Sequence, residues 1–178
     1  MKLKFVFDAS PLIHLTNAGL NPHIVDLEGE KYTVPAVFDE VVRKGRELNY
    51  PDAAGAELLV RRGTLRVKAP QKKGMDAIAR LHNDIHAGEL EVIALAKEIS
   101  AIAIIDDRVA RAVAKIQGVR IEGSYGVILR AAARGSISRE EAEAALRNLV
   151  KSGWRCDAEL YATLITSLKR LVKQRTGR

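Results

Sequence analysis

Short apolar runs that alternate with helical patterns are the feature of this sequence that most limits its fold. The clearest run, residues 101–105, is apolar throughout, and its three isoleucines favour a buried strand. Residues 3–7 predict a first strand, and residues 32–34, 65–68 and 118–121 predict shorter or weaker ones. Strands separated by helices indicate βαβ units and a parallel sheet. The sequence therefore predicts an α/β fold.

The helical patterns lie between and after these runs. We expect helices at residues 10–18, 35–47, 52–62, 75–83, 89–99, 107–116, 125–134, 139–151 and 157–174. Pro11 occupies a first-turn position that suits proline, and Ser138 with Glu141 has the spacing of a capping box. The Ala87-Gly88 pair is expected to break the chain between two helices. The last helix is amphipathic, which suits either a helix that closes the domain or one that binds a partner.

Length and composition narrow the class of protein. A chain of 178 residues fits one domain and is long enough to bury a core without disulfide or metal staples. The single cysteine, Cys156, excludes an intramolecular disulfide and a multi-cysteine zinc site. No apolar run reaches the length of a membrane span, and the stretch 2–7 is too short for a signal peptide. We therefore expect a cytoplasmic protein.

The charge balance points to a polyanionic partner. The formal net charge is +7, and nucleic acid is the simplest polyanion that such a protein binds. Basic residues of the C-terminal tail, from Lys169 to Arg178, supply much of this excess. The tail could equally be a solubilising end.

Two predicted strands end in carboxylates. Asp8 follows the first strand, and Asp106 with Asp107 follows the apolar strand at 101–105. Parallel strands deliver the residues after their C-terminal ends to one edge of the sheet, where ligands usually bind. These acids should therefore lie close together if the two strands are neighbours. Each could also be an ordinary turn or helix-capping residue.

Glu89 has an unusual place on its predicted helix. At about 100° per residue, its side chain lies about 40° from the centre of the apolar face formed within residues 92–99. Glu91 lies about 120° from that centre and is expected to be a solvated surface acid. A carboxylate directed at a core is costly unless it is paired, hydrogen-bonded or bound to metal. Glu89 is therefore a candidate site residue, although its first-turn position also suits capping.

The helix predicted at 35–47 carries two further acids, Asp39 and Glu40. Both lie about 130° from the centre of its apolar face, on opposite flanks, so periodicity does not choose between them.

Several carboxylates around one site repel each other unless a divalent cation neutralises them. Hard oxygen ligands suit Mg²⁺ or Mn²⁺, and such a site can promote hydrolysis of a phosphodiester. Arg108 and Arg111 lie near the same edge and could bind phosphate oxygens or pair with neighbouring acids.

An ordered set of motifs resembles the PIN-domain family, and most closely the bacterial and archaeal group that includes the VapC-type toxin ribonucleases. The motifs are FVFDASPLIHL, VPAVFDEVV, HAGELEVIALA and AIIDDRVARAVA, and the likeness covers about residues 3–135. The resemblance implies a three-layer α/β/α fold, RNA cleavage with Mg²⁺ or Mn²⁺, a homodimer and a small antitoxin partner. It also implies a PIN-like nuclease domain at residues 1–135, followed by a helical extension at 136–178 packed on the same domain.

The same resemblance assigns the catalytic acids. It places them at Asp8, Glu40, Glu89 and Asp107, which chooses Glu40 over Asp39.

Supporting roles follow from the resemblance less directly. Asp8, Glu89 and Asp107 would bind metal, with Asp106 as an additional ligand. Ser10 and Ser124 would support the site, and Arg108 is a further supporting candidate from its place near the same edge of the sheet, not from the resemblance.

These expectations converge on a metal-dependent endoribonuclease, the toxin of a toxin–antitoxin pair. Two alternatives stay open. In the first, Asp8 is the nucleophile of an aspartyl-phosphate phosphotransferase, although Asp8-Ala9-Ser10 lacks the second aspartate that many such enzymes carry. In the second, the fold is a non-catalytic binding or regulatory subunit.

Overall fold

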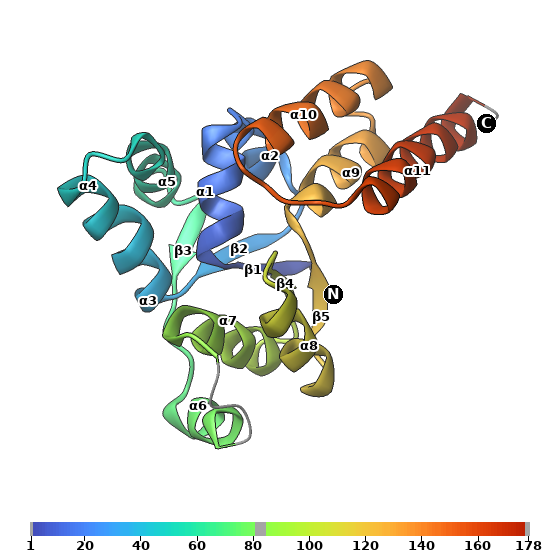
Figure 1. Cartoon of the computed structure of the whole chain (residues 1–178). Helices are drawn as coiled ribbons and strands as arrows, with labels where there is room; N and C mark the ends of the chain where they lie inside the picture. The colour runs from blue at the N-terminus through green and yellow to red at the C-terminus, as the bar shows by residue number, and fades with distance from the viewer. Residues whose placement is uncertain (1, 81–84, 177–178) are drawn as a thin grey trace.

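One sheet of five parallel strands is formed within residues 2–80 and 85–176, which the computed structural model describes (Figure 1). Its strands are β1 (Lys4–Phe7), β2 (Glu30–Thr33), β3 (Leu65–Val67), β4 (Ile102–Ile104) and β5 (Arg120–Glu122). Their spatial order is β3-β2-β1-β4-β5. The predicted α/β class with a parallel sheet is confirmed.

The two strands that end in aspartates are neighbours at the centre of the sheet. Phe5 pairs with Ile102 and Phe7 with Ile104, so β1 and β4 end side by side. From β1 the chain proceeds outward through β2 to β3, and β4 and β5 then extend the sheet on the other side. The strand order therefore reverses between β1 and β4, and ligands of open α/β sheets usually bind at such a point.

Helices cover both faces of the sheet (Figure 1). They are α1 (Ala9–Asn17), α2 (Asn21–Asp26), α3 (Pro35–Phe38), η1 (Asp39–Lys44), α4 (Gly45–Glu47), α5 (Pro51–Arg61), α6 (Lys72–Ala79), α7 (Ala87–Glu98), α8 (Arg108–Ile116), α9 (Ser124–Arg134), α10 (Arg139–Lys151) and α11 (Ala158–Thr176). Helices α7 and α8 lie on one face, with α6 packed against α7, and α1 and α9 lie on the other (Figure 1). Burial on both faces explains why β1 and β4 are apolar without alternation. The arrangement is the expected three-layer α/β/α fold.

Three helical expectations need correction. The helix expected at 89–99 begins at Ala87, so the Ala87-Gly88 pair is not a break but the first turn of α7. The short helix α2 was not expected, because a six-residue segment is too short to show a helical period. The helix expected at 75–83 begins earlier, at Lys72, and α6 ends at Ala79; residues 81–84 lie outside the described part.

The helix expected at 35–47 is continuous, but its middle is π-helical. The segment η1 spans Asp39–Lys44 between the α-helical turns α3 and α4. π-Helical turns are rare and are frequently found at functional sites.

The last two helices pack on the rest of the fold. The predicted capping box of α10 is present: Ser138 Oγ accepts a hydrogen bond from the Glu141 amide, and Glu141 Oε2 accepts one from the Ser138 amide, at 3.1 and 2.6 Å. Leu149 of α10 and Leu168 of α11 are fully buried and belong to the same core as the sheet. A domain boundary at residue 135 stays a prediction. Within the described residues, every helix is too short or too polar to cross a membrane.

Candidate functional site

A cavity of about 520 Å³ lies at the C-terminal edge of the sheet, next to β1. The starts of α1 and α7 and the segment η1 line it, and its carboxylates are Asp8, Asp39, Glu40 and Glu89. A Cβ atom placed on Gly88 would lie 4.0 Å from Asp8 Oδ1 and 4.0 Å from Glu40 Oε2. The first turn of α7 thus approaches both carboxylates closely, and the structure brings three of the four predicted catalytic acids to one cavity.

Asp8 is the buried member of this group, with 3% of its surface exposed. Its backbone N–H donates to the Ile104 carbonyl at 3.1 Å, and the Thr33 hydroxyl donates to the Phe7 carbonyl at 3.0 Å. Both contacts fix the chain where β1 ends. The pKa of Asp8 is raised to about 7, and burial is the largest cause. The nearby carboxylates of Glu89, Glu40 and Asp106 add to the rise, while a hydrogen bond from the Ala9 amide opposes it.

Glu89 has both of the roles that its sequence position suggested. Its Oε2 accepts a hydrogen bond from the His86 backbone amide at 3.0 Å, which caps α7, and its side chain lines the cavity. Burial raises the pKa of Glu89, and the charges of Asp107 and Glu40 add to the rise, while the bond from His86 opposes it.

The expectation for Glu91 was wrong. This residue is half-buried, and its Oε2 accepts a hydrogen bond from the Ala36 amide at 3.0 Å. Glu91, which belongs to α7, therefore caps the N-terminus of α3 and connects these two helices beside the cavity. The helical wheel of α7 could not show this, because the partner lies 55 residues away in the sequence.

Segment η1 presents both of the acids between which the wheel could not choose. Asp39 and Glu40 line the cavity together. Asp39 pairs with Arg43 at 2.9 Å, whereas the charge of Glu40 acts on Asp8 and Glu89. Glu40 is therefore the acid of this pair whose charge acts on the buried Asp8 and the half-buried Glu89.

Asp106 and Asp107 lie beside the cavity rather than in its wall. Both oxygens of Asp106 accept from Ser124, Oδ1 from the backbone amide at 2.8 Å and Oδ2 from the hydroxyl at 2.5 Å. Asp107 caps α8, with Oδ1 accepting from the Val109 and Ala110 amides, each at 2.8 Å. Their charges still reach the cavity, because Asp106 raises the pKa of Asp8 and Asp107 raises that of Glu89.

Ser124 is fully buried, and we predict that it positions Asp106. Replacing Ser124 by alanine removes the hydroxyl bond to Asp106 Oδ2 and keeps the amide bond to Oδ1. We expect a loss of about 1–3 kcal/mol in the free energy of unfolding, measured by urea denaturation, because a bond to a charged group is lost. The exposed Ser136→Ala variant should change little, and equal stability of the two variants would refute this role.

Several helices begin at this edge of the sheet. Helix α1 starts directly after Asp8, α7 after His86, α8 after Asp107 and α9 after Gly123. The N-terminus of a helix carries a partial positive charge that favours nearby anions. These termini offset part of the repulsion among the acids and would also attract a phosphate group.

The arginines after β4 do not serve as partners of the acids. Arg111 donates to the Ile105 carbonyl at 2.9 Å, and Arg108 is exposed on α8 and is not part of the cavity wall. The described residues contain no ion pair between either arginine and an acid, contrary to one reading of the sequence.

The donor chemistry of the site fits a hard divalent cation. The donors are carboxylate oxygens, and the buried Asp8 is ionised only at a cost that a cation would remove. Within residues 2–80 and 85–176, however, no three such side chains are already arranged around one metal position. Glu89, Asp106 and Asp107 are instead engaged with protein donors, each through the oxygens named above.

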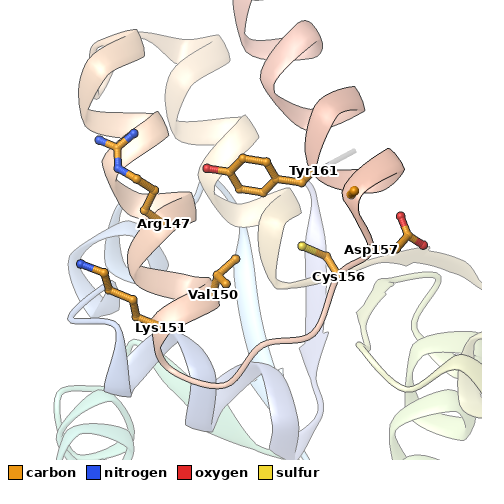
Figure 2. A pocket seen from close by; sticks show the side chains of 7 residues that line it. Arg147, Val150, Lys151, Cys156, Asp157 and Tyr161 are labelled. Carbon is orange, nitrogen blue, oxygen red and sulfur yellow. The ribbon is translucent and has the colours of Figure 1, made fainter.

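A second cavity, of about 440 Å³, lies between α10 and α11 (Figure 2). The side chains of Val150, Cys156 and Tyr161 point toward one another across it, with Arg147 and Lys151 on α10 (Figure 2). Burial raises the pKa of the Cys156 thiol, which does not favour a nucleophile. This cavity shares no residue with the acidic one.

The fold is a parallel α/β sheet, and carboxylates gather where its strand order reverses. These two features are those expected of a PIN domain. A family model described as a PIN domain matches residues 4–170. This chain belongs to the PIN-domain family, as its motifs led us to expect.

Two curated relatives carry the same name, Endoribonuclease Nob1. The protein of Pyrococcus abyssi (strain GE5 / Orsay) is 34% identical over 126 residues, which are 67% of this chain and 68% of the relative. The protein of Methanocaldococcus jannaschii is 32% identical over 127 residues, which are 69% of this chain and 57% of the relative. The chain thus spans little more than half the length of this second relative.

Proposed function

We propose that this chain is an endoribonuclease that hydrolyses RNA phosphodiester bonds with Mg²⁺ or Mn²⁺. The observation that carries the proposal is the cavity that joins Asp8, Glu40 and Glu89, with Asp106 and Asp107 coupled to it by charge. Membership of the PIN-domain family and the names of the two relatives support RNA as the substrate. The net charge of +7 is consistent with a nucleic-acid substrate.

In this proposal Asp8, Glu89, Asp106 and Asp107 hold the cation, and Glu40 completes the acidic wall. When bound, the cation would supply Lewis-acid activation of water and stabilisation of the negative charge that develops on the phosphoryl oxygens. The backbone of Asp8 is held by its bond to the Ile104 carbonyl of β4, and its carboxylate accepts a hydrogen bond from the Ala9 amide, which favours a defined position of the carboxylate. Ser10, in the first turn of α1, offers a hydroxyl at the cavity wall. The amides at the start of α1 would favour a phosphate oxygen.

The proposal is tested with the isolated protein and a labelled single-stranded RNA. We expect internal cleavage with Mg²⁺ or Mn²⁺, no cleavage after a chelator is added, and recovery when the ion is restored. Failure to cleave any RNA in the presence of either ion would contradict the proposal. Trapping of labelled phosphate on Asp8 would favour the phosphotransferase alternative.

The finer predictions from the resemblance are a toxin role, a small antitoxin and a homodimer. Their support is the order of the four motifs, which is closest to the VapC-type group. A short neighbouring reading frame that encodes a DNA-binding protein able to block RNA cleavage would support the toxin role. Truncation after residue 135 would test whether residues 1–135 fold without the C-terminal helices.

A further inference from the structure

The acidic cavity has one lysine in its wall. Lys44 is the last residue of η1, four residues after Glu40, and both residues line the cavity. The lysine is exposed, and no ion pair of the described residues includes it. Lys44 therefore shares the cavity wall with the carboxylates, and none of the ion pairs named for the described residues holds it.

The adjacent residue Arg43 is also exposed but differs in its contacts and in its place relative to the cavity. Its guanidinium pairs with Asp39 at 2.9 Å and lies 5.7 Å from the centre of the Phe38 ring. It does not belong to the cavity wall. Two neighbouring cations of one helical segment therefore have different surroundings, which makes Arg43 a matched control for Lys44.

The need for a cation follows from the charges of the site. A phosphodiester that approaches Asp8, Glu40 and Glu89 meets several negative charges, only part of which one divalent cation would neutralise. The arginines on α8 do not meet this need, because Arg111 is bonded to the Ile105 carbonyl and Arg108 lies outside the cavity wall.

We propose that Lys44 binds a backbone phosphate of the RNA strand and so places the strand on the η1 side of the cavity. This inference rests on the proposed function and extends it to the position of the substrate. The ammonium group is a compact charge with three donors on a flexible stem, which suits a phosphate whatever the base attached to it. Lys44 is thus a substrate-binding residue that does not read the RNA sequence.

The test measures binding and cleavage separately. Fluorescence anisotropy with a labelled single-stranded RNA, in chelator and over a series of KCl concentrations, gives the salt dependence of the affinity for wild type, Lys44→Ala, Lys44→Arg and Arg43→Ala. Loss of one phosphate contact on a single strand reduces the slope of log K against log salt by about 0.7. We expect this reduction in Lys44→Ala, a slope near that of wild type in Lys44→Arg, and an unchanged slope in Arg43→Ala.

Cleavage by the same variants completes the test. We expect KM to rise about tenfold in Lys44→Ala with a smaller change in kcat, equally for RNAs of different sequence, because a non-specific phosphate contact is lost. The melting temperature should not change, since the side chain is exposed.

Each of the following outcomes overturns the inference. An unchanged salt slope in Lys44→Ala shows that no contact is made, and an equal loss in Arg43→Ala shows general attraction rather than a contact in the cavity. Tighter Mn²⁺ binding by Lys44→Ala with an unchanged slope makes Lys44 an internal counter-ion of the acids. If wild type binds RNA and Lys44→Ala shows the expected slope difference but wild type cleaves none, the proposed function fails and the Lys44 contact stands. If wild type neither binds RNA in chelator nor cleaves it with Mg²⁺ or Mn²⁺, both fail.

Discussion

Replacing Asp8 by asparagine is expected to stabilise the metal-free protein at pH 8. Asparagine has nearly the same shape and can still accept the bond from the Ala9 amide, but it carries no charge to bury. Since the pKa of Asp8 is raised from 3.8 to about 7, the ionised form is disfavoured in the folded state. We expect a gain of about 2–4 kcal/mol in the free energy of unfolding at pH 8.

The stability difference between Asp8→Asn and wild type should depend on pH, and its sign can be predicted. Below about pH 4 Asp8 is protonated in both the folded and unfolded states, so the variant gains nothing. Between about pH 4 and 7 the unfolded state releases the proton first, and wild type loses stability relative to the variant. The gain should therefore grow across this window and be complete above about pH 7.

Urea denaturation in chelator at several pH values measures this difference. Asp39→Asn is the control. It removes a carboxylate of the same cavity whose side chain is nearly half exposed and pairs with Arg43, and such a surface ion pair contributes little to the free energy of unfolding. A variant that is less stable than wild type at pH 8 would show that the Asp8 carboxylate is not strained by burial.

The second large effect is the loss of RNA cleavage in the Asp8→Asn and Glu89→Gln double variant. Both side chains line the cavity and would hold the cation. Since the stabilisation that a metal ion supplies amounts to several kcal/mol, its loss should lower the cleavage rate by about three orders of magnitude or more. The more stable fold and the lost activity are expected together, because a strained site is where function and stability oppose each other.

The matched control for this loss is Glu98→Gln at the far end of α7. Glu98 accepts a bond from the Gln71 amide at 2.9 Å, which glutamine can also accept, and it lies outside the cavity wall. This variant should cleave RNA like wild type. Cleavage that persists in a folded double variant, as judged by its melting curve, would remove these two acids from the mechanism.

The central part of the fold could be predicted from the sequence. The apolar runs at β1 and β4 are buried on both faces, so composition alone marked them, and the rule for parallel strands then placed Asp8 beside Asp106. The sequence singled out Glu89 because a carboxylate near the apolar face of a helix is costly, and the structure places this residue in the wall of the acidic cavity.

The rest depended on contacts that no local pattern contains. The choice between Asp39 and Glu40 needed the family resemblance, because both are equally distant from the apolar face of their helix. The π-helical turn of η1 does not follow a 3.6-residue period, so helical periodicity predicted neither this turn nor the place of Lys44 in the cavity wall. The bonds of Ser124 with Asp106 and of Glu91 with Ala36 join residues 18 and 55 positions apart.

Calorimetric titration of Mn²⁺ into the protein at pH 8 tests the central claim most directly, because it measures the ion at the acidic cavity without any assumption about the RNA. We predict that wild type binds Mn²⁺, that the affinity falls as the pH is lowered through about 7 while Asp8 takes up a proton, and that Asp8→Asn together with Glu89→Gln abolishes binding. Equal Mn²⁺ affinity in wild type and in the folded double variant would contradict the account.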